Sequence, residues 1–316
     1  MKDLILILLI GTTLSAYSQN MTREEALTKD ALEAFRKCTV SLGIVDTAIY
    51  QTYNEKFIKE KNFNIVGTGV MFPFKFGKIN GACIVTAKHV FHDPKNNFFP
   101  RQLNFRLSMY DSLGVNEYFG EQLNLYMSNA QMWIAHPDST IDLACIVLVH
   151  KPREYFPPVS IISYESFAKN DDYFEGKEIY VFGYPGFISP DLSNQAFLRK
   201  GIIGWVSKNK RYLKDRIMID CNIYPGNSGG PVFSVPKTSS TTDFVPPRFY
   251  GLVSQTRTIY NKVQTQNVQL VDSLKMPFYT PEPTASGIII TADKVYELLQ
   301  YISKDYINII NKQIKR

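Results

Sequence analysis

The sequence has few of the residues that mark metal-binding or nucleic-acid-binding proteins. Its 316 residues include only four cysteines and four histidines, and the histidines have no cysteine or acidic neighbours at metal-ligand spacing. The net charge is +6, but the lysines and arginines are interspersed rather than grouped with aromatic residues. We therefore expect no metal site, no cofactor and no nucleic-acid partner, and we interpret the charge as a mildly basic surface.

Long apolar runs are also scarce. After residues 4–10, no stretch is long and apolar enough to cross a bilayer. That run and the following Ala16-Tyr17-Ser18 have the form of a secretory signal peptide with its cleavage site, so we predict a signal peptide at residues 1–18. An uncleaved anchor is the alternative, but the run is short for a span. The mature protein is expected to be secreted or periplasmic, with no stable membrane insertion after signal cleavage, and its oligomeric state stays open.

The cysteines do not indicate a disulfide framework. Four cysteines allow three pairings, and export would permit them. Each one, however, lies in or beside an apolar, strand-like run, which favours buried free thiols. None has the surroundings of a catalytic nucleophile. The four positions are Cys38, Cys83, Cys145 and Cys221.

What the chain does contain is typical of β structure. Aromatic residues make up 13% of it and hydrophobic residues 45%, which is enough for a large core or two domains. Helical periodicity is limited to Met21–Lys37 and to a segment that follows Thr291 and runs through Tyr306 or beyond. The polar stretch from Arg257 to Ala285 is expected to be an irregular insertion loop. Strands are predicted at residues 39–45, 65–72, 81–86, 141–148, 178–183, 200–206, 216–221, 249–256 and 286–290.

A turn rich in glycine, at residues 224–231, is the most informative stretch. It reads Tyr-Pro-Gly-Asn-Ser-Gly-Gly-Pro and lies between two apolar, strand-like runs. Glycines around Ser228 allow a tight turn that aims backbone N–H groups at one point beside a hydroxyl. Acyl transfer needs this combination of a nucleophile and donors for the developing negative charge. A plain turn between strands is the alternative, since all these residues favour turns.

Two upstream segments supply the partners of such a serine. His89 follows the strand-like residues 84–87, and an imidazole accepts a proton near neutrality. Asp142 opens an apolar strand, where an imidazole N–H would satisfy its buried carboxylate. Asp138 is the competing carboxylate, but it lies in a polar turn, so we favour Asp142. His92, His136 and His150 are interpreted as surface or structural histidines.

These three segments together resemble the signatures of trypsin-like, chymotrypsin-fold serine proteases. Thr86-Ala87-Lys88-His89, Asp142-Leu143-Ala144 and residues 226–231 occur in the chymotrypsin order His, Asp, Ser. The Gly183-Tyr184-Pro185-Gly186 turn and the asparagine before the serine are similar to bacterial secreted proteases of the glutamyl-endopeptidase and HtrA kind. The resemblance implies an all-β fold with two chymotrypsin-like barrels and short helices at both ends. The segments are then a signal peptide (1–18), an N-terminal helical segment (19–37), a first barrel (38–160) and a second barrel with the C-terminal helix (161–316).

The resemblance also implies a serine endopeptidase that acts on protein or peptide substrates. Ser228 would be the nucleophile, His89 the base and Asp142 its orienting carboxylate, with the N–H groups of Gly226 and Ser228 as the oxyanion hole. The implied substrate pocket comprises Asn222, Ile223, Ser254, Gln255 and Thr256. None of these is charged, which favours an uncharged, small or apolar substrate side chain.

Asn227 is a departure from the trypsin pattern. Trypsins carry an aspartate there, which pairs with a new N-terminal ammonium after zymogen cleavage; Asn227 cannot form that ion pair, so we predict no trypsin-style zymogen switch. The alternative function is a catalytically silent binding protein on the same scaffold. A third possibility is a peptidase that stays inactive until a partner reorders the loops around Gly226.

Overall fold

The computed structural model describes residues 21–51, 57–77, 79–110, 116–128, 130–148, 162–186, 195–207, 216–238, 244–262 and 279–314. The predicted signal peptide lies outside these residues, as does His150. In the described part of the chain, no helix is both long enough and apolar enough to cross a membrane.

The first half forms one antiparallel, seven-stranded sheet, in the order β5-β4-β1-β2-β3-β9-β8. Strands β3 and β9 are central to the site, because Ala87 at the end of β3 pairs with Leu143 at the start of β9. That register places the residues just after β3 and just before β9 side by side. The bounds are β1 Thr39–Gln51, β2 Phe57–Phe76, β3 Ile79–Ala87, β4 Gln102–Tyr110, β5 Asn116–Asn124, β8 Trp133–Ala135 and β9 Leu143–Leu148.

The second half forms a closed barrel, in the order β10-β11-β12-β17-β16-β13. The glycine-rich turn at residues 224–230 joins β12 to β13. Two small ribbons, β6–β7 and β14–β15, complete the strands. The barrel strands are β10 Glu178–Gly183, β11 Phe197–Val206, β12 Arg216–Asp220, β13 Pro231–Phe233, β16 Phe249–Lys262 and β17 Tyr279–Thr291; the ribbons are Tyr126–Met127 with Ala130–Gln131, and Lys237–Thr238 with Phe244–Val245.

Three apolar clusters fill the molecule. One lies within the first sheet and one within the barrel. The third lies at the junction and takes residues from both sheets and from the two terminal helices. Burying apolar side chains at this junction removes them from water and so stabilises one arrangement of the two halves.

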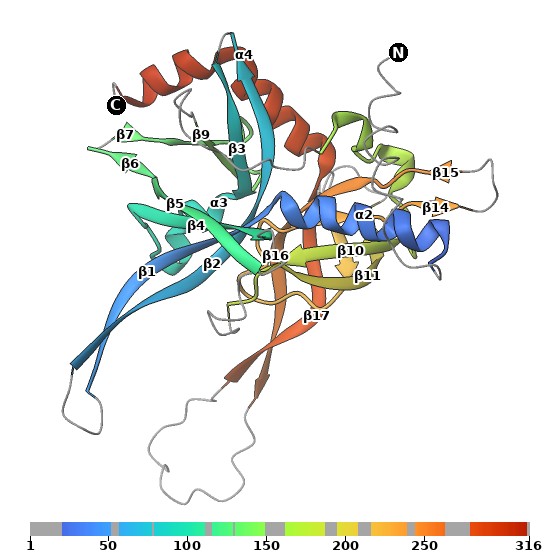
Figure 1. The fold of residues 1–316 in the computed structure, drawn as a ribbon, viewed down its shortest axis with the longest axis horizontal. Coiled ribbons are helices and arrows are strands. Elements are labelled where there is room, and N and C mark those ends of the chain that lie inside the picture. Colours follow the sequence, from blue (N-terminus) through green and yellow to red (C-terminus); the bar gives the residue numbers. More distant parts are fainter. Residues whose placement is uncertain are drawn as a thin grey trace, which may run out of the picture.

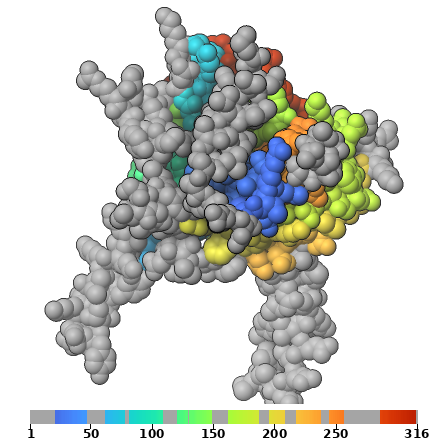
Figure 2. Space-filling model, turned by 45° about the vertical axis from the view of Figure 1, so that its right-hand side comes forward, coloured from blue at the N-terminus to red at the C-terminus, as the bar shows by residue number. Residues whose placement is uncertain are grey.

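Helices α2 (Arg23–Lys37) and α4 (Ala292–Ile314) are the two terminal helices that the sequence predicts. Thr22 caps α2, because its hydroxyl accepts from the Glu25 N–H and the Glu25 carboxylate accepts from the Thr22 N–H. The helix lies on the outside of the molecule (blue in Figures 1 and 2) and stacks Phe35 on Phe233 of the barrel, with ring centroids 4.0 Å apart. Helix α2 therefore packs on the body as a structural element.

Helix α4 begins directly after Thr291 and continues beyond Tyr306, as the sequence predicts, with a kink at Asp305, where the backbone is not helical. It packs beside β2, β8 and β9 of the first sheet as well as β16 of the barrel (Figure 1). Tyr306 lies edge-on against Phe74 of β2, with ring centroids 5.1 Å apart. The C-terminal helix thus connects the barrel strand that precedes it to the back of the first sheet. The remaining helices are short: α3 Lys88–Phe91 and the 3-10 turns Pro94–Asn96, Tyr164–Ser166 and Asn170–Asp172.

The prediction of an irregular loop from Arg257 to Ala285 is wrong at both ends. Strand β16 continues to Lys262 and pairs there with Tyr279, the first residue of β17. The two strands leave the barrel as a ribbon (Figure 1). A ribbon outside the body needs no alternating apolar face, because backbone hydrogen bonds hold it, so periodicity could not reveal it.

All four cysteines are buried and free, as their apolar surroundings predicted. Burial raises the pKa of the Cys38 and Cys83 thiols to about 12. A thiol with so high a pKa is protonated at neutral pH and is a poor nucleophile.

Candidate active site

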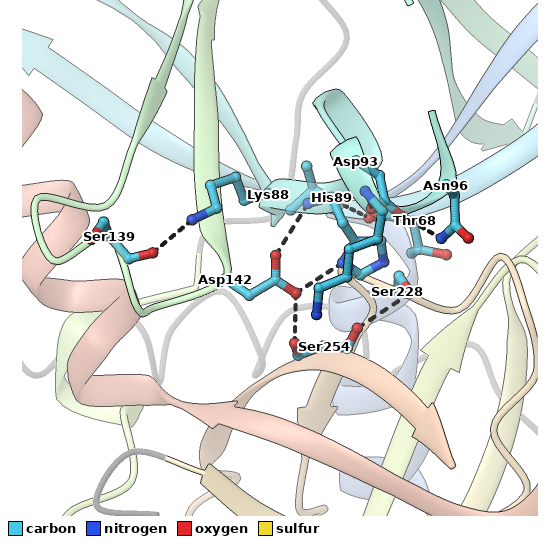
Figure 3. Close-up of polar contacts among 11 residues, drawn as sticks. Thr68, Lys88, His89, Asp93, Asn96, Ser139, Asp142, Ser228 and Ser254 are labelled. Carbon is cyan, nitrogen blue, oxygen red and sulfur yellow. Dashed lines mark hydrogen bonds and ion pairs between the residues drawn. The ribbon is translucent and has the colours of Figure 1, made fainter. Parts of the chain in front are cut away.

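His89 and Asp142 meet because the register of β3 and β9 places them together. His89 lies in the short helix α3 directly after β3, and Asp142 directly precedes β9. One carboxylate oxygen of Asp142, Oδ1, accepts from the His89 backbone N–H at 3.1 Å, and the other, Oδ2, lies 2.8 Å from His89 Nδ1 (Figure 3). An ionised carboxylate only accepts, so Nδ1 carries the ring proton and Nε2 is left as the acceptor.

Asp142 also receives a hydrogen bond from the barrel. Ser254 Oγ, on β16, donates to Asp142 Oδ2 at 2.7 Å. Burial raises the pKa of Asp142, but the hydrogen bonds and charge of His89 and the hydrogen bond of Ser254 outweigh it, so that the pKa is lowered. The carboxylate is therefore ionised at neutral pH. The Asp142 side chain is 14% exposed and the His89 side chain 32%, so the imidazole is open to a ligand.

Ser228 lies in the same cleft as these residues. Its hydroxyl donates to Ser254 O at 3.5 Å, and among the described residues no hydrogen bond joins it to His89. Figure 3 shows the side chains of Ser228, His89, Asp142 and Ser254 gathered around one point. The cleft has a volume of about 490 Å³, and His89, Asp142, Ser228, Ser254 and Gln255 are among its lining residues.

The turn around Ser228 needs glycine at two positions. Gly226 and Gly229 have φ values of +94° and +86°, in the left-handed region that other residues rarely adopt. A Cβ at Gly226 would also collide with Tyr184 O, and one at Gly229 would collide with Thr68 O and the Thr86 hydroxyl. The glycines are therefore required both by the backbone conformation and by the close approach of other segments of the chain.

Two backbone N–H groups of this turn are left for a ligand. Pro225 O accepts from Gly186 N at 2.9 Å, and Asn227 O accepts from Gly230 N at 2.9 Å. Because a trans peptide unit is planar, with its C=O and N–H on opposite sides, these bonds fix the N–H groups of the following residues. Those residues are Gly226 and Ser228. Neither N–H has a partner among the residues that the structure describes.

Thr68, on β2, holds the serine turn from the first sheet. Its N–H donates to Ser228 O at 2.7 Å, and its hydroxyl donates to Gly226 O at 2.7 Å while accepting from Tyr184 N at 3.0 Å. Its carbonyl accepts from the buried Thr86 hydroxyl at 2.6 Å. Sequence reasoning did not single out Thr68; the two glycines that flank it were the only local signal.

The structure does not bring all the expected pocket residues to the cleft. Ser254 and Gln255 line it, whereas Asn222 and Ile223 are not among its lining residues. Ile223 is buried in the apolar cluster of the barrel. Thr256 continues β16, and its backbone pairs with Gly287. Ser254, expected as a pocket residue, lines the cleft and also hydrogen-bonds Asp142, a second role that only the fold reveals.

Asp138 and the other described histidines lie away from the Asp142 carboxylate. Asp138 Oδ1 accepts from both the N–H and the hydroxyl of Thr140 in an exposed turn. His136 is buried, and its Nδ1 accepts from Asp138 N at 3.1 Å. His92 lines the cleft beside His89 and packs its ring edge-on against Phe99. No group of three or more potential metal ligands occurs among the described residues.

Comparison with known proteins identifies the family. A model of the trypsin-like peptidase domain matches residues 67–237, more than half of the chain, and includes His89, Asp142 and Ser228. The chain therefore belongs to the trypsin-like peptidase domain family. The predicted fold class is confirmed: a mostly β chymotrypsin-like fold with two barrels, the first of them an open half-barrel in the described residues.

Among solved structures, the chain is similar to the Drosophila Grass clip serine protease of the Toll pathway. The match has 13% sequence identity and a TM-score of 0.44, and it covers 95% of this chain and 77% of that chain. No curated protein matches. Family membership supports a serine-type peptidase that acts on proteins or peptides.

Proposed function

We propose that the protein is a serine endopeptidase with Ser228 as nucleophile, His89 as general base and Asp142 as orienting carboxylate. The observation that carries the proposal is the 2.8 Å contact between Asp142 Oδ2 and His89 Nδ1, in a cleft that also contains Ser228. Membership of a peptidase family adds weight to the same interpretation. Each residue type fits its step of acyl transfer.

In the proposed reaction, Ser228 Oγ bonds to the carbonyl carbon of the substrate, and its proton passes to His89 Nε2. Ser228 first turns from Ser254 O toward the imidazole, a rotation about one side-chain bond. The imidazolium is stabilised by Asp142 and then gives its proton to the leaving amine. Water, activated by the same imidazole, hydrolyses the resulting ester and restores the serine hydroxyl.

The negative charge on the carbonyl oxygen is taken by the N–H groups of Gly226 and Ser228. They are the two donors of the turn that lack a partner among the described residues. The bonds from Gly186 and Gly230 to the neighbouring carbonyls hold them in place before the substrate arrives. Donors fixed in advance stabilise a transition state without reorganising, and removing one lowers turnover by about two to three orders of magnitude.

Substrate preference and relationship are finer proposals. Ser254 and Gln255, the expected pocket residues that line the cleft, are uncharged, and on these two residues we propose a preference for an uncharged substrate side chain; Lys88, Asp93 and Lys95 line other parts of the cleft. A closer relationship to bacterial secreted proteases of the glutamyl-endopeptidase and HtrA kind stays a proposal, based on Asn227 and the Gly183–Gly186 turn. Secretion or export to the periplasm stays a proposal too, based on the predicted signal peptide at residues 1–18.

Hydrolysis of a quenched fluorescent casein tests the function directly. The wild type is expected to release fluorescence, and Ser228→Ala is expected to lose at least about five orders of magnitude in turnover. Ser234→Ala is the matched control, since Ser234 lies on the same chain segment beyond β13 and hydrogen-bonds Arg248 instead of the cleft. Equal hydrolysis by the wild type and Ser228→Ala would contradict the proposal, whereas a silent wild type would favour a binding protein or a partner-activated peptidase.

A further inference from the structure

Arg199 is a cation without a carboxylate partner near the serine turn. It lies on β11 and is half-buried, and burial lowers the pKa of its guanidinium. Among the described residues no carboxylate pairs with it. Removing a charge from water without a counter-charge is unfavourable, so other contacts must hold this side chain in place.

Those contacts are with the serine turn itself. The guanidinium lies over the Tyr224 ring, with Cζ 5.2 Å from the ring centroid. The groups around the Asn227 side chain are donors, which assigns its amide oxygen to face them; in that orientation Oδ1 accepts from Arg199 Nη1 at 3.3 Å and from Tyr224 N at 3.2 Å. Asn227 is 0% exposed, and a Cβ at Gly183 would lie only 2.9 Å from its Cγ. The Asn227 side chain therefore has little freedom to move away from Arg199.

We infer that Arg199 is a positioning residue that holds Tyr224 and Asn227, and through them the N–H groups of Gly226 and Ser228. The inference rests on the proposed function, because the role it gives to Arg199 is to support the proposed oxyanion hole. Gly226 lies between the two residues that Arg199 contacts, and Asn227 directly precedes Ser228. Loss of the guanidinium removes one contact from each end of that short segment, which the backbone hydrogen bonds of the turn then hold alone.

The inference predicts a change in turnover rather than in substrate binding. Arg199→Met keeps an unbranched apolar stem but removes the guanidinium. Its kcat is expected to fall about 10- to 100-fold, the range for losing a hydrogen bond from a charged group, with KM unchanged because the donors act in the transition state. Lys200→Met is the control: Lys200 is the next residue of β11, but it is exposed and pairs with Glu178, so no change is expected.

A double-mutant cycle with Asn227→Asp separates this role from a merely structural one. Beside Arg199, the new carboxylate gains a buried partner and is expected to be tolerated. In Arg199→Met, the same carboxylate is buried alone, and both the labelling rate by a fluorophosphonate and the equilibrium constant for folding should fall further, by about 100-fold or more. If Arg199→Met does not fold, Arg199→Gln removes the charge but keeps a donor, and the same coupling is expected.

The outcomes distinguish the role inferred for Arg199 from the proposed peptidase function. A coupled cycle with an active wild type supports the inference. Equal effects of Asn227→Asp in both backgrounds, or Arg199→Met behaving like Lys200→Met, would overturn it. A wild type that neither hydrolyses casein nor reacts with the probe would overturn the proposed function, and the cycle measured in folding equilibria would still decide whether Arg199 holds Asn227.

Discussion

Asp142 receives hydrogen bonds from both halves of the molecule. The backbone and ring of His89 bind it from the first sheet, and Ser254 Oγ binds it from the barrel. The carboxylate thus fixes the tautomer of the imidazole and links the two halves behind it. Its lowered pKa keeps it ionised, and therefore an acceptor, at neutral and mildly acidic pH.

Asp142→Asn is expected to lower kcat by about four orders of magnitude, because the amide can donate to Nδ1 and would favour the wrong tautomer. Asp138→Asn is the matched control, since that carboxylate accepts only from its own turn among the described residues. The test is to measure kcat of the two variants in steady-state hydrolysis of a peptide substrate. A loss in Asp138→Asn, or none in Asp142→Asn, would show that the orienting carboxylate has been assigned wrongly.

Thr68 is the second residue whose role depends on both halves. Its hydroxyl is the acceptor for Tyr184 N and the donor to Gly226 O. Thr68→Val keeps the shape but leaves a buried N–H and a buried carbonyl without this partner, which should lower the free energy of unfolding by about 1–3 kcal/mol and reduce kcat. Thr68→Ser keeps the hydroxyl and should retain most of the free energy of unfolding and most of kcat. Urea unfolding alongside kinetics tests this, and equal behaviour of the two variants would contradict it.

At the scale of elements, helix α4 and the turn between β8 and β9 meet at a buried histidine. The His136 side chain is 1% exposed, and its Nε2 lies 3.5 Å from Glu297 Oε2 on α4, within ion-pair distance but without a hydrogen bond. Burial lowers the pKa of His136, against the raising effects of Asp138 and Glu297, and Lys294 lowers it further. The folded protein therefore keeps this ring neutral.

This burial makes stability depend on pH. The unfolded chain binds a proton at His136 below about pH 6.5, while the folded chain binds it only at a lower pH. The free energy of unfolding should therefore fall as pH decreases from about 6.5 toward the lowered value, by at most about 1.4 kcal/mol per pH unit. His136→Asn, whose side-chain oxygen can still accept from Asp138 N, should flatten that dependence. An unchanged slope in urea unfolding between about pH 7.5 and 5.5 would contradict the prediction.

At the scale of the whole molecule, the N-terminal segment is part of the folded body. Helix α2 stacks Phe35 on Phe233 and places the Arg36 guanidinium over the Phe182 ring, 5.3 Å from its centroid. The chain continues from α2 directly into β1. The neutral Asn227 has no charge to pair with a released N-terminal ammonium, so the absence of a trypsin-style zymogen switch stays a prediction.

We accordingly expect activity without any N-terminal cleavage beyond removal of the predicted signal peptide. Protein with an affinity tag ahead of its N-terminus and the same protein after tag removal should hydrolyse a peptide substrate at equal rates, because neither α-amino group takes part in the site. Intact mass before and after the assay establishes that no further cleavage has occurred. Activity that appears only after a cut upstream of residue 39 would contradict this expectation.

Features encoded in one local segment could be predicted from the sequence, whereas contacts between residues far apart in the sequence could not. The order and polarity of the segments pointed to His89, Asp142 and Ser228, and the polar turn around Asp138 set it apart. The links from Thr68 to the serine turn join residues about 160 positions apart, as the Ser254–Asp142 bond joins residues 112 apart, and no local pattern encodes them. The β16–β17 ribbon was missed for a different reason, since strands that leave the barrel are held by backbone hydrogen bonds and need no apolar periodicity.

The central claim is that Ser228 is a nucleophile activated by His89 and Asp142 beside a formed oxyanion hole. Reaction with a fluorophosphonate probe, followed by mass spectrometry of the labelled peptide, tests it most directly, because the probe needs both an activated hydroxyl and the oxyanion donors. One adduct on Ser228 is expected in the wild type, and none in Ser228→Ala or His89→Ala. An adduct on another residue, or labelling of wild type and Ser228→Ala alike, would contradict the claim.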